Sequence, residues 1–269
     1  MWGVTRAHGG RVRLRIEDHD RQRSRREYDQ AIVEDLAWLG FTADGPPVRQ
    51  SDRHELYARA LDRLRAQGLV YACDCSRAEI GGPRYPGTCR DRRLEEIAGR
   101  GVRVRLEPSV ERFVDLRHGS QEQQPSEQCG DLLAIDRAGN WTYQFAVTVD
   151  DLQQGVTLVI RGDDLLDSTG RQLQLARLLG REEPPRFLHH PLIMKSAEQK
   201  LSKSDGDTGI RELRARGWTP ARVIGHAAAL AGLISAPRDV SIEEVSSIIP
   251  EESRRSGGSR GRVDGRHQT

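Results

Sequence analysis

The chain has 269 residues, which is enough for one large domain with appendages and for a substantial apolar core. Its 42 basic and 40 acidic residues nearly cancel, so the composition excludes a general nucleic-acid coat protein but leaves room for a local RNA-binding patch. No apolar run is long enough to span a membrane and the first residues lack the apolar segment of a secretion signal, so we expect a cytoplasmic protein without membrane contact.

The first third of the chain alternates between strand and helix patterns. Residues 11–16 (RVRLRI) carry an apolar side chain at every second position, which predicts a strand that runs into the acidic segment 17–20. Apolar residues at helical spacing then predict helices over 28–39 and 56–64, each followed by a glycine that can end it.

Residues 69–130 differ in composition and contain all four cysteines, so we interpret them as an inserted module. Strand patterns return over 131–162, where apolar runs on either side of the turn at 138–140 predict a hairpin with 141–147 as its second strand. The remaining patterns predict a helix, a strand and a second helix, in that order, over 172–179, 188–194 and 219–234. This alternation predicts an α/β fold with a largely parallel sheet, followed by a disordered tail.

Lysine is rare in this chain and concentrated in one place. Only three basic residues are lysines, and Lys195, Lys200 and Lys203 lie within nine residues of one another. A compact ammonium group cannot be replaced freely by the wide guanidinium of arginine. The segment KLSKS, which ends at Ser204, can present two cations to a polyphosphate and stabilise the charge that develops when the α-phosphorus of ATP is attacked. An ordinary solvated loop is the alternative interpretation.

The cysteines suggest either a metal site or simple thiols, because disulfides are rare in the cytoplasm. Cys73 and Cys75 are followed by Cys89, whereas a structural zinc ion needs four tetrahedral ligands. Spacing alone therefore leaves both a zinc site and buried free thiols open. Cys129 lies outside the pattern and is expected to be an ordinary thiol.

Four segments resemble motifs of the glutamyl branch of the class I aminoacyl-tRNA synthetases, in order and at compatible spacing. They are LRIEDHD at 14–20, WTYQFAVTVDD at 141–151, VIRGDDLLDSTGRQLQLARLLG at 159–180 and KLSKS at 200–204. The resemblance implies a Rossmann-type catalytic domain that uses ATP with Mg²⁺, an inserted zinc-type module and a short C-terminal helical region. The implied division is a split catalytic domain over 1–70 and 130–195, the module over 71–129, the KLSKS loop and helical region over 196–250, and a disordered tail over 251–269.

The resemblance also implies substrate contacts at matching positions. Glu17 and Tyr143 would contact glutamate, and Arg161 would bind one of its carboxylates, because the guanidinium fork pairs with a carboxylate through two hydrogen bonds. From the residues alone, Glu17 could instead be a solvated acid and Tyr143 a core residue. Arg161 ends an apolar strand, which is where open α/β sheets bind ligands.

The same family resemblance implies how ATP and zinc are bound. Lys200, Ser202 and Lys203 would contact ATP, and the two lysines would act in catalysis. The zinc module of the family reads C-x-C…Y-x3-C. The implied ligands of one structural zinc ion are therefore Cys73, Cys75, Tyr85 and Cys89.

Within the family, the chain most resembles the stand-alone branch that attaches glutamate to the queuosine base of tRNA(Asp). Only 65 residues follow Ser204, fewer than the ~100 of a typical anticodon-binding domain. The expected partners are glutamate, ATP and tRNA(Asp), bound by a monomer. A fragment of a discriminating glutamyl-tRNA synthetase and a catalytically dead tRNA- or zinc-binding module are the alternatives.

The resemblance starts after the first motif of the family. Family members begin with a strand and a glycine-rich HIGH-type motif that contributes to the glutamate and ATP sites, whereas Met1 aligns with the helix that follows this motif. We therefore expect an N-terminal truncation, from a misassigned start or a decayed gene, and an impaired ATP site.

Overall fold

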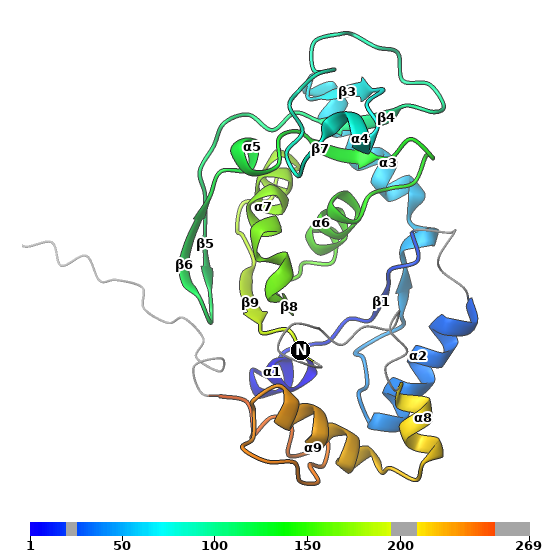
Figure 1. The fold of residues 1–269 in the computed structure, drawn as a ribbon, viewed down its shortest axis with the longest axis vertical. Coiled ribbons are helices and arrows are strands. Elements are labelled where there is room, and N and C mark those ends of the chain that lie inside the picture. The colour runs from blue at the N-terminus through cyan, green and yellow to red at the C-terminus, as the bar shows by residue number, and fades with distance from the viewer. Residues whose placement is uncertain (20–25, 195–208, 251–269) are drawn as a thin grey trace, which may run out of the picture.

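The computed structural model describes residues 1–19, 26–194 and 209–250, which form an α/β fold with three small sheets (Figure 1). The KLSKS segment lies outside the described residues, and so do Lys195 and the tail over 251–269. No helix in the described part of the chain has both the length and the apolar character needed to cross a membrane.

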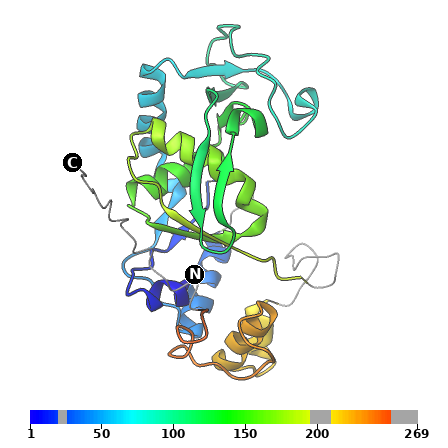
Figure 2. The same cartoon turned by 90° about the vertical axis from the view of Figure 1, so that its left-hand side faces the viewer.

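The largest sheet carries Asp115, Arg161 and His189 of the candidate site. Its strands lie in the order β6-β5-β9-β8. β9 is parallel to both β8 and β5, whereas β6 returns antiparallel to β5 as a hairpin, seen lengthwise at the centre of Figure 2. The bounds are β5 (Glu111–Asp115), β6 (Gly119–Gln123), β8 (Leu158–Gly162) and β9 (Arg186–His190).

Helix α7 (Thr169–Leu178) packs on this sheet, and helix α6 (Tyr143–Gln153) joins α7 to the main apolar core. The two helices pack against each other, and α7 also contacts β5 and β6. α3 (His54–Ala66) packs on α6, so that Leu64, Phe145 and Leu175 are completely buried in one core.

A second sheet lies at the upper end of the molecule in Figure 1 and is entirely antiparallel, in the order β3-β4-β7. Its strands are β3 (Val70–Cys73), β4 (Gly101–Val104) and β7 (Leu132–Ile135). The third sheet is a short parallel pair, β1 (Arg15–Ile16) with β2 (Val48–Arg49), which leads directly into the candidate site.

The remaining helices lie outside the main apolar core. α9 begins as predicted, because Pro220 opens it and the Thr219 hydroxyl accepts the backbone N–H of Arg222. α2 and α9 share an apolar cluster at the lower end in Figure 1. The bounds are α1 (Trp2–Ala7), α2 (Arg26–Leu39), η1 (Gln50–Asp52), α4 (Arg77–Ile80), α5 (Pro125–Gln128), η2 (Asp163–Ser168), α8 (Ile210–Ala215) and α9 (Pro220–Leu230).

Three sequence-based predictions of strands are wrong in part. The turn at 138–140 exists, but the residues after it form helix α6 rather than the second strand of a hairpin. Every residue from Phe145 to Asp150 is buried, so this part of the helix has no exposed polar face that would reveal helical periodicity. Of the strand predicted over 11–16 only β1 pairs with another strand, and the strand predicted over 188–194 begins earlier, as β9.

Candidate active site

A buried arginine occupies the end of strand β8. Arg161 is 9% exposed, and its guanidinium donates hydrogen bonds to three uncharged acceptors. These acceptors are His189 Nε2 at 2.9 Å, Thr169 Oγ1 at 2.8 Å and Gln172 Oε1 at 2.6 Å. No carboxylate in the described part of the chain forms an ion pair with Arg161. Burial lowers the pKa of this guanidinium, which nevertheless stays charged, so it is a cation that a carboxylate ligand would stabilise.

The orientation of Arg161 depends on a fully buried histidine and aspartate. His189 Nδ1 lies 2.7 Å from Asp115 Oδ2, and this oxygen also accepts the backbone N–H of His189 at 3.0 Å. A carboxylate can only accept, so Nδ1 carries the proton and Nε2 presents its lone pair to Arg161. Burial lowers the pKa of His189, which favours this neutral form.

The carboxylate of Asp115 is itself fixed by the backbone. Its Oδ1 accepts the N–H groups of Arg117 and His118, both at 2.9 Å, in the turn between β5 and β6. Although burial opposes ionisation, these hydrogen bonds and those of His189 hold the pKa of Asp115 below its usual value. The hairpin thus orients Arg161 through His189 without neutralising it.

The three residues predicted to contact glutamate lie near enough to one another for the charges of Glu17 and Arg161 to act on the Tyr143 hydroxyl. Tyr143 begins helix α6, Glu17 follows strand β1, and Arg161 ends the apolar part of β8. Burial raises the pKa of the Tyr143 hydroxyl, the charge of Glu17 raises it further, and the charge of Arg161 opposes both. The structure therefore brings an exposed carboxylate, a half-buried phenol and an unpaired guanidinium together.

A buried carboxylate on α6 holds this region in place. Asp150 is 0% exposed and accepts hydrogen bonds from Arg53 Nε at 2.6 Å, Gln50 Nε2 at 2.8 Å and the Tyr57 hydroxyl at 2.9 Å. Its neighbour Asp151 accepts from Arg15 at 2.7 Å, and Arg15 also donates to Glu17 at 3.2 Å. The hydrogen bonds of Asp150 and Asp151 therefore connect helix α6 to η1 and to strand β1, next to Glu17.

A separate cluster gathers three of the four cysteines. The sulfur atoms of Cys73, Cys75 and Cys89 lie within 4.8 Å of one another, and the Tyr85 hydroxyl lies 3.4 Å from the Cys73 sulfur and 4.0 Å from that of Cys75. A tetrahedral zinc ion with bonds of about 2.3 Å sets its sulfur ligands about 3.8 Å apart. The four side chains are therefore compatible with such an ion, and Cys129 hydrogen-bonds elsewhere, to Pro125.

A buried arginine lies against this cluster. The guanidinium of Arg103 stacks on the ring of Tyr85, with its central carbon 3.6 Å from the ring centroid, and donates to the Asp131 carbonyl at 2.9 Å. Burial raises the pKa of the Cys73 thiol, but its hydrogen-bonding interactions with Tyr85 and Arg103 outweigh it and leave that pKa below its ordinary value. Arg103 thus provides positive charge next to ligands that become anionic when they bind a metal.

Comparison with known proteins shows the family to which this chain belongs. Residues 1–233 match the family model of tRNA synthetases class I (E and Q), catalytic domain. The chain belongs to this family of class I synthetases. It is therefore a ligase of the aminoacyl-tRNA synthetase type, as the sequence motifs predict.

Several class I relatives are similar over most of this chain. A glutamyl-Q tRNA(Asp) synthetase of Symbiobacterium thermophilum is 42% identical over 275 residues, which cover 92% of this chain and 84% of that protein. Glutamate–tRNA ligase 2 of Syntrophus aciditrophicus is 38% identical, and the match spans 55% of its length. The solved glutamate-tRNA synthetase of Elizabethkingia anophelis has a TM-score of 0.76 at 24% identity and supports the fold alone; the match covers 94% of this chain and 61% of that one.

The site residues predicted from the sequence of this synthetase remain predictions. Glu17 and Arg161 both act electrostatically on Tyr143, whereas the predicted ATP contacts Lys200, Ser202 and Lys203 lie outside the described residues. Asp115 and His189 were not predicted, although each is a polar residue within an apolar strand segment. That signal, a titratable side chain at an inward position of a strand, could have identified both.

Proposed function

We propose that this chain activates glutamate with ATP and transfers it to the queuosine base of tRNA(Asp). The observation that carries the proposal is the unpaired, buried cation of Arg161 beside Tyr143 and Glu17. A guanidinium pairs with a carboxylate, and an exposed carboxylate such as Glu17 can pair with an ammonium group. An amino acid with an additional carboxylate fits this combination of charges.

Activation joins glutamate to AMP. An oxygen of the α-carboxylate forms a bond to the α-phosphorus of ATP while the bond from that phosphorus to pyrophosphate breaks, and pyrophosphate leaves with the bonding pair. Arg161 binds the other carboxylate and Glu17 the ammonium group, so that the reacting oxygen is directed at the phosphorus. Lys200, Ser202 and Lys203 contact the phosphates, whose remaining negative charge a bound Mg²⁺ would partly neutralise.

Transfer then consumes the adenylate. A hydroxyl oxygen of the RNA forms an ester bond with the glutamyl carbonyl carbon, the bond from that carbon to the phosphate oxygen breaks, and AMP and a proton are released. Relatives named glutamyl-Q tRNA(Asp) synthetase support tRNA(Asp) as the RNA. The relative named glutamate–tRNA ligase 2 favours tRNA(Glu) as a second candidate.

The cysteine cluster has a structural part in this proposal. One zinc ion bound by Cys73, Cys75, Tyr85 and Cys89 would hold together the loops that follow β3. Bound zinc of this kind stabilises a fold and supplies no chemistry to the reaction. The protein acts as a monomer.

Radiolabelled glutamate distinguishes the candidate acceptors. We expect ATP-dependent label on tRNA(Asp) that contains queuosine, and none on the same tRNA with guanosine at that position. Label on tRNA(Glu) would support the second candidate instead. Binding of tRNA with no transfer to any RNA would contradict both and leave a tRNA-binding module.

A further inference from the structure

Arg161 is oriented by a side-chain amide whose own direction is set by further hydrogen bonds. Its guanidinium donates to Gln172 Oε1 at 2.6 Å, the shortest of the three hydrogen bonds described above. Gln172 is 7% exposed and turns its amide nitrogen to Gln144 Oε1, at 2.7 Å. Gln144 donates in turn to the Ser168 hydroxyl at 3.1 Å. This chain of hydrogen bonds, from Arg161 through Gln172 and Gln144 to Ser168, is called the amide relay below.

The direction of the amide relay follows from its first member. A guanidinium can only donate, so Gln172 must present its oxygen to Arg161 and its nitrogen to Gln144. Gln144 must then present its oxygen to Gln172 and its nitrogen to Ser168. The hydroxyl of Ser168 accepts here, although a hydroxyl can also donate. Neither of the amides nor the hydroxyl carries a negative charge, so the amide relay fixes the guanidinium and leaves its charge uncompensated.

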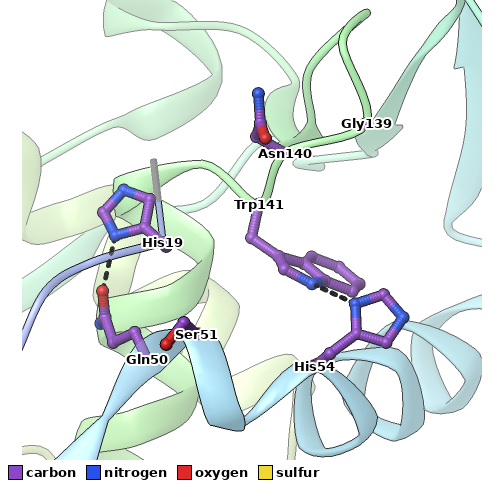
Figure 3. A pocket seen from close by; sticks show the side chains of 7 residues that line it. All are labelled: His19, Gln50, Ser51, His54, Gly139, Asn140 and Trp141. Carbon is purple, nitrogen blue, oxygen red and sulfur yellow. Dashed lines mark hydrogen bonds between the residues drawn. The ribbon is translucent and has the colours of Figure 1, made fainter. Parts of the chain in front are cut away.

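Three packed elements hold the members of the amide relay in place. Gln172 lies in helix α7, Ser168 ends η2, and Gln144 lies in the first turn of α6. Helices α6 and α7 pack against each other. Three positions before Gln144, the side chain of Trp141 donates to His54 Nδ1 on α3 at 3.1 Å, which fixes the start of α6 (Figure 3). The backbone positions of the amide relay are therefore set by helix packing and need no ligand.

The absence of charge on Gln172 decides what Arg161 can bind. A carboxylate in place of this amide would lie in direct contact with the guanidinium, and two charges buried at such a distance attract each other strongly. A guanidinium already paired in this way would gain little from a carboxylate ligand and would favour a neutral one. The amide has nearly the same shape as a carboxylate, so it positions the guanidinium without pairing with its charge.

We infer that Gln172 determines the specificity of this site for a carboxylate side chain over the corresponding amide. It is a positioning residue, because it acts through Arg161 and need not touch the amino acid. The inference rests on the proposed activation of glutamate and adds the residue that allows Arg161 to distinguish glutamate from glutamine. Exchange of one nitrogen atom for oxygen in this side chain should therefore change which amino acid is bound.

Gln172→Glu tests the inference with almost no change of shape. If the amide of Gln144 turns over, its nitrogen faces the new carboxylate and the Ser168 hydroxyl donates instead of accepting, so every hydrogen bond of the amide relay can be kept. Binding of glutamate and of glutamine is measured by isothermal titration calorimetry without ATP. We expect Gln172→Glu to bind glutamate about 100-fold more weakly than wild type and to lose the preference for glutamate over glutamine. An unchanged ratio of the two affinities would overturn the inference.

Two further variants separate the added charge from the loss of a hydrogen bond. Gln144→Glu places a carboxylate in the same amide relay, but one side chain further from Arg161. Because attraction falls with distance, it should cost glutamate at least about fivefold less affinity than Gln172→Glu does, and equal losses would overturn the inference. Gln172→Met removes the acceptor without adding charge, so it should weaken glutamate binding by about tenfold and still prefer glutamate. Loss of that preference in Gln172→Met would also overturn the inference.

The inference and the proposed function can fail separately. Binding of the amino acid needs neither ATP nor RNA, whereas activation is measured by glutamate-dependent ATP–pyrophosphate exchange. A wild-type chain that prefers glutamate in calorimetry but shows no exchange would contradict the proposed function and leave the inference standing. A wild-type chain that binds glutamate and glutamine equally, or binds neither, would overturn the inference whatever the exchange assay shows.

Discussion

Replacing Asp115 by asparagine tests whether the hairpin orients Arg161 through His189. The carboxylate accepts four hydrogen bonds, two at each oxygen, and an amide has only one oxygen to offer. If the amide nitrogen faces His189, the ring must move its proton to Nε2, where it meets the N–H of Arg161. Arg161 then loses an acceptor and its fixed direction.

The size of the effect follows from the loss of one hydrogen bond that involves a charged group. Such a bond contributes about 1.5–3 kcal/mol, which corresponds to about 10- to 150-fold in affinity. Arg161 holds glutamate both before and during the reaction, so we expect the loss mainly in KM for glutamate and less in kcat. The assay is glutamate-dependent ATP–pyrophosphate exchange at varied glutamate concentration.

Matched variants separate orientation from simple loss of stability. His189→Gln can place an amide oxygen where Nε2 was, whereas the shorter side chain of His189→Asn cannot reach Arg161. We therefore expect a smaller rise in KM for His189→Gln than for His189→Asn. We expect no rise for Arg112→Gln, which changes an exposed residue on the strand that carries Asp115. Equal KM values for the two His189 variants, or a wild-type KM for Asp115→Asn, would refute the reasoning.

Three further outcomes are expected. Burial lowers the pKa of His189, so below pH ~6.5 the unfolded chain binds a proton that the folded chain does not bind readily. The free energy of unfolding, measured by urea titration, should therefore fall from pH 7.5 to pH 5.5. The fall should be less steep for His189→Gln. Metal analysis after dialysis should find one zinc per chain, and none for Cys89→Ser, with a lower melting temperature after chelation. Arg103→Met should release zinc to a competing chelator about tenfold more readily than wild type, while Arg112→Gln should match wild type; equal retention would contradict a stabilising charge at Tyr85.

Local patterns predicted two helices within a few residues. Apolar side chains recur on one side of α3, and Gly68 follows it with positive φ. Helix α7 is buried over most of its length, and the signal that marks its end is Gly180, which also has positive φ. Helix α6 was predicted as a strand, because it is buried on nearly all sides and periodicity carries no information there.

Only those residues of the candidate site that lie in sequence motifs could be predicted. Glu17, Tyr143 and Arg161 lie in segments whose sequences resemble motifs of the family, and the cysteine spacing indicates a cluster. The pairing of Asp115 with His189 joins residues 74 positions apart through adjacent strands. No local pattern encodes such a contact, since it depends on which strands become neighbours in the sheet.

Arg161 is proposed to select a second carboxylate on the amino acid to be activated. Amino-acid-dependent ATP–pyrophosphate exchange, measured with glutamate, glutamine and aspartate for the wild type and for Arg161→Gln, tests it most directly. We predict exchange with glutamate alone for the wild type, and a loss of at least about 100-fold in kcat/KM for the variant. Wild-type exchange that prefers glutamine, or a variant that activates glutamate as well as the wild type, would contradict the claim.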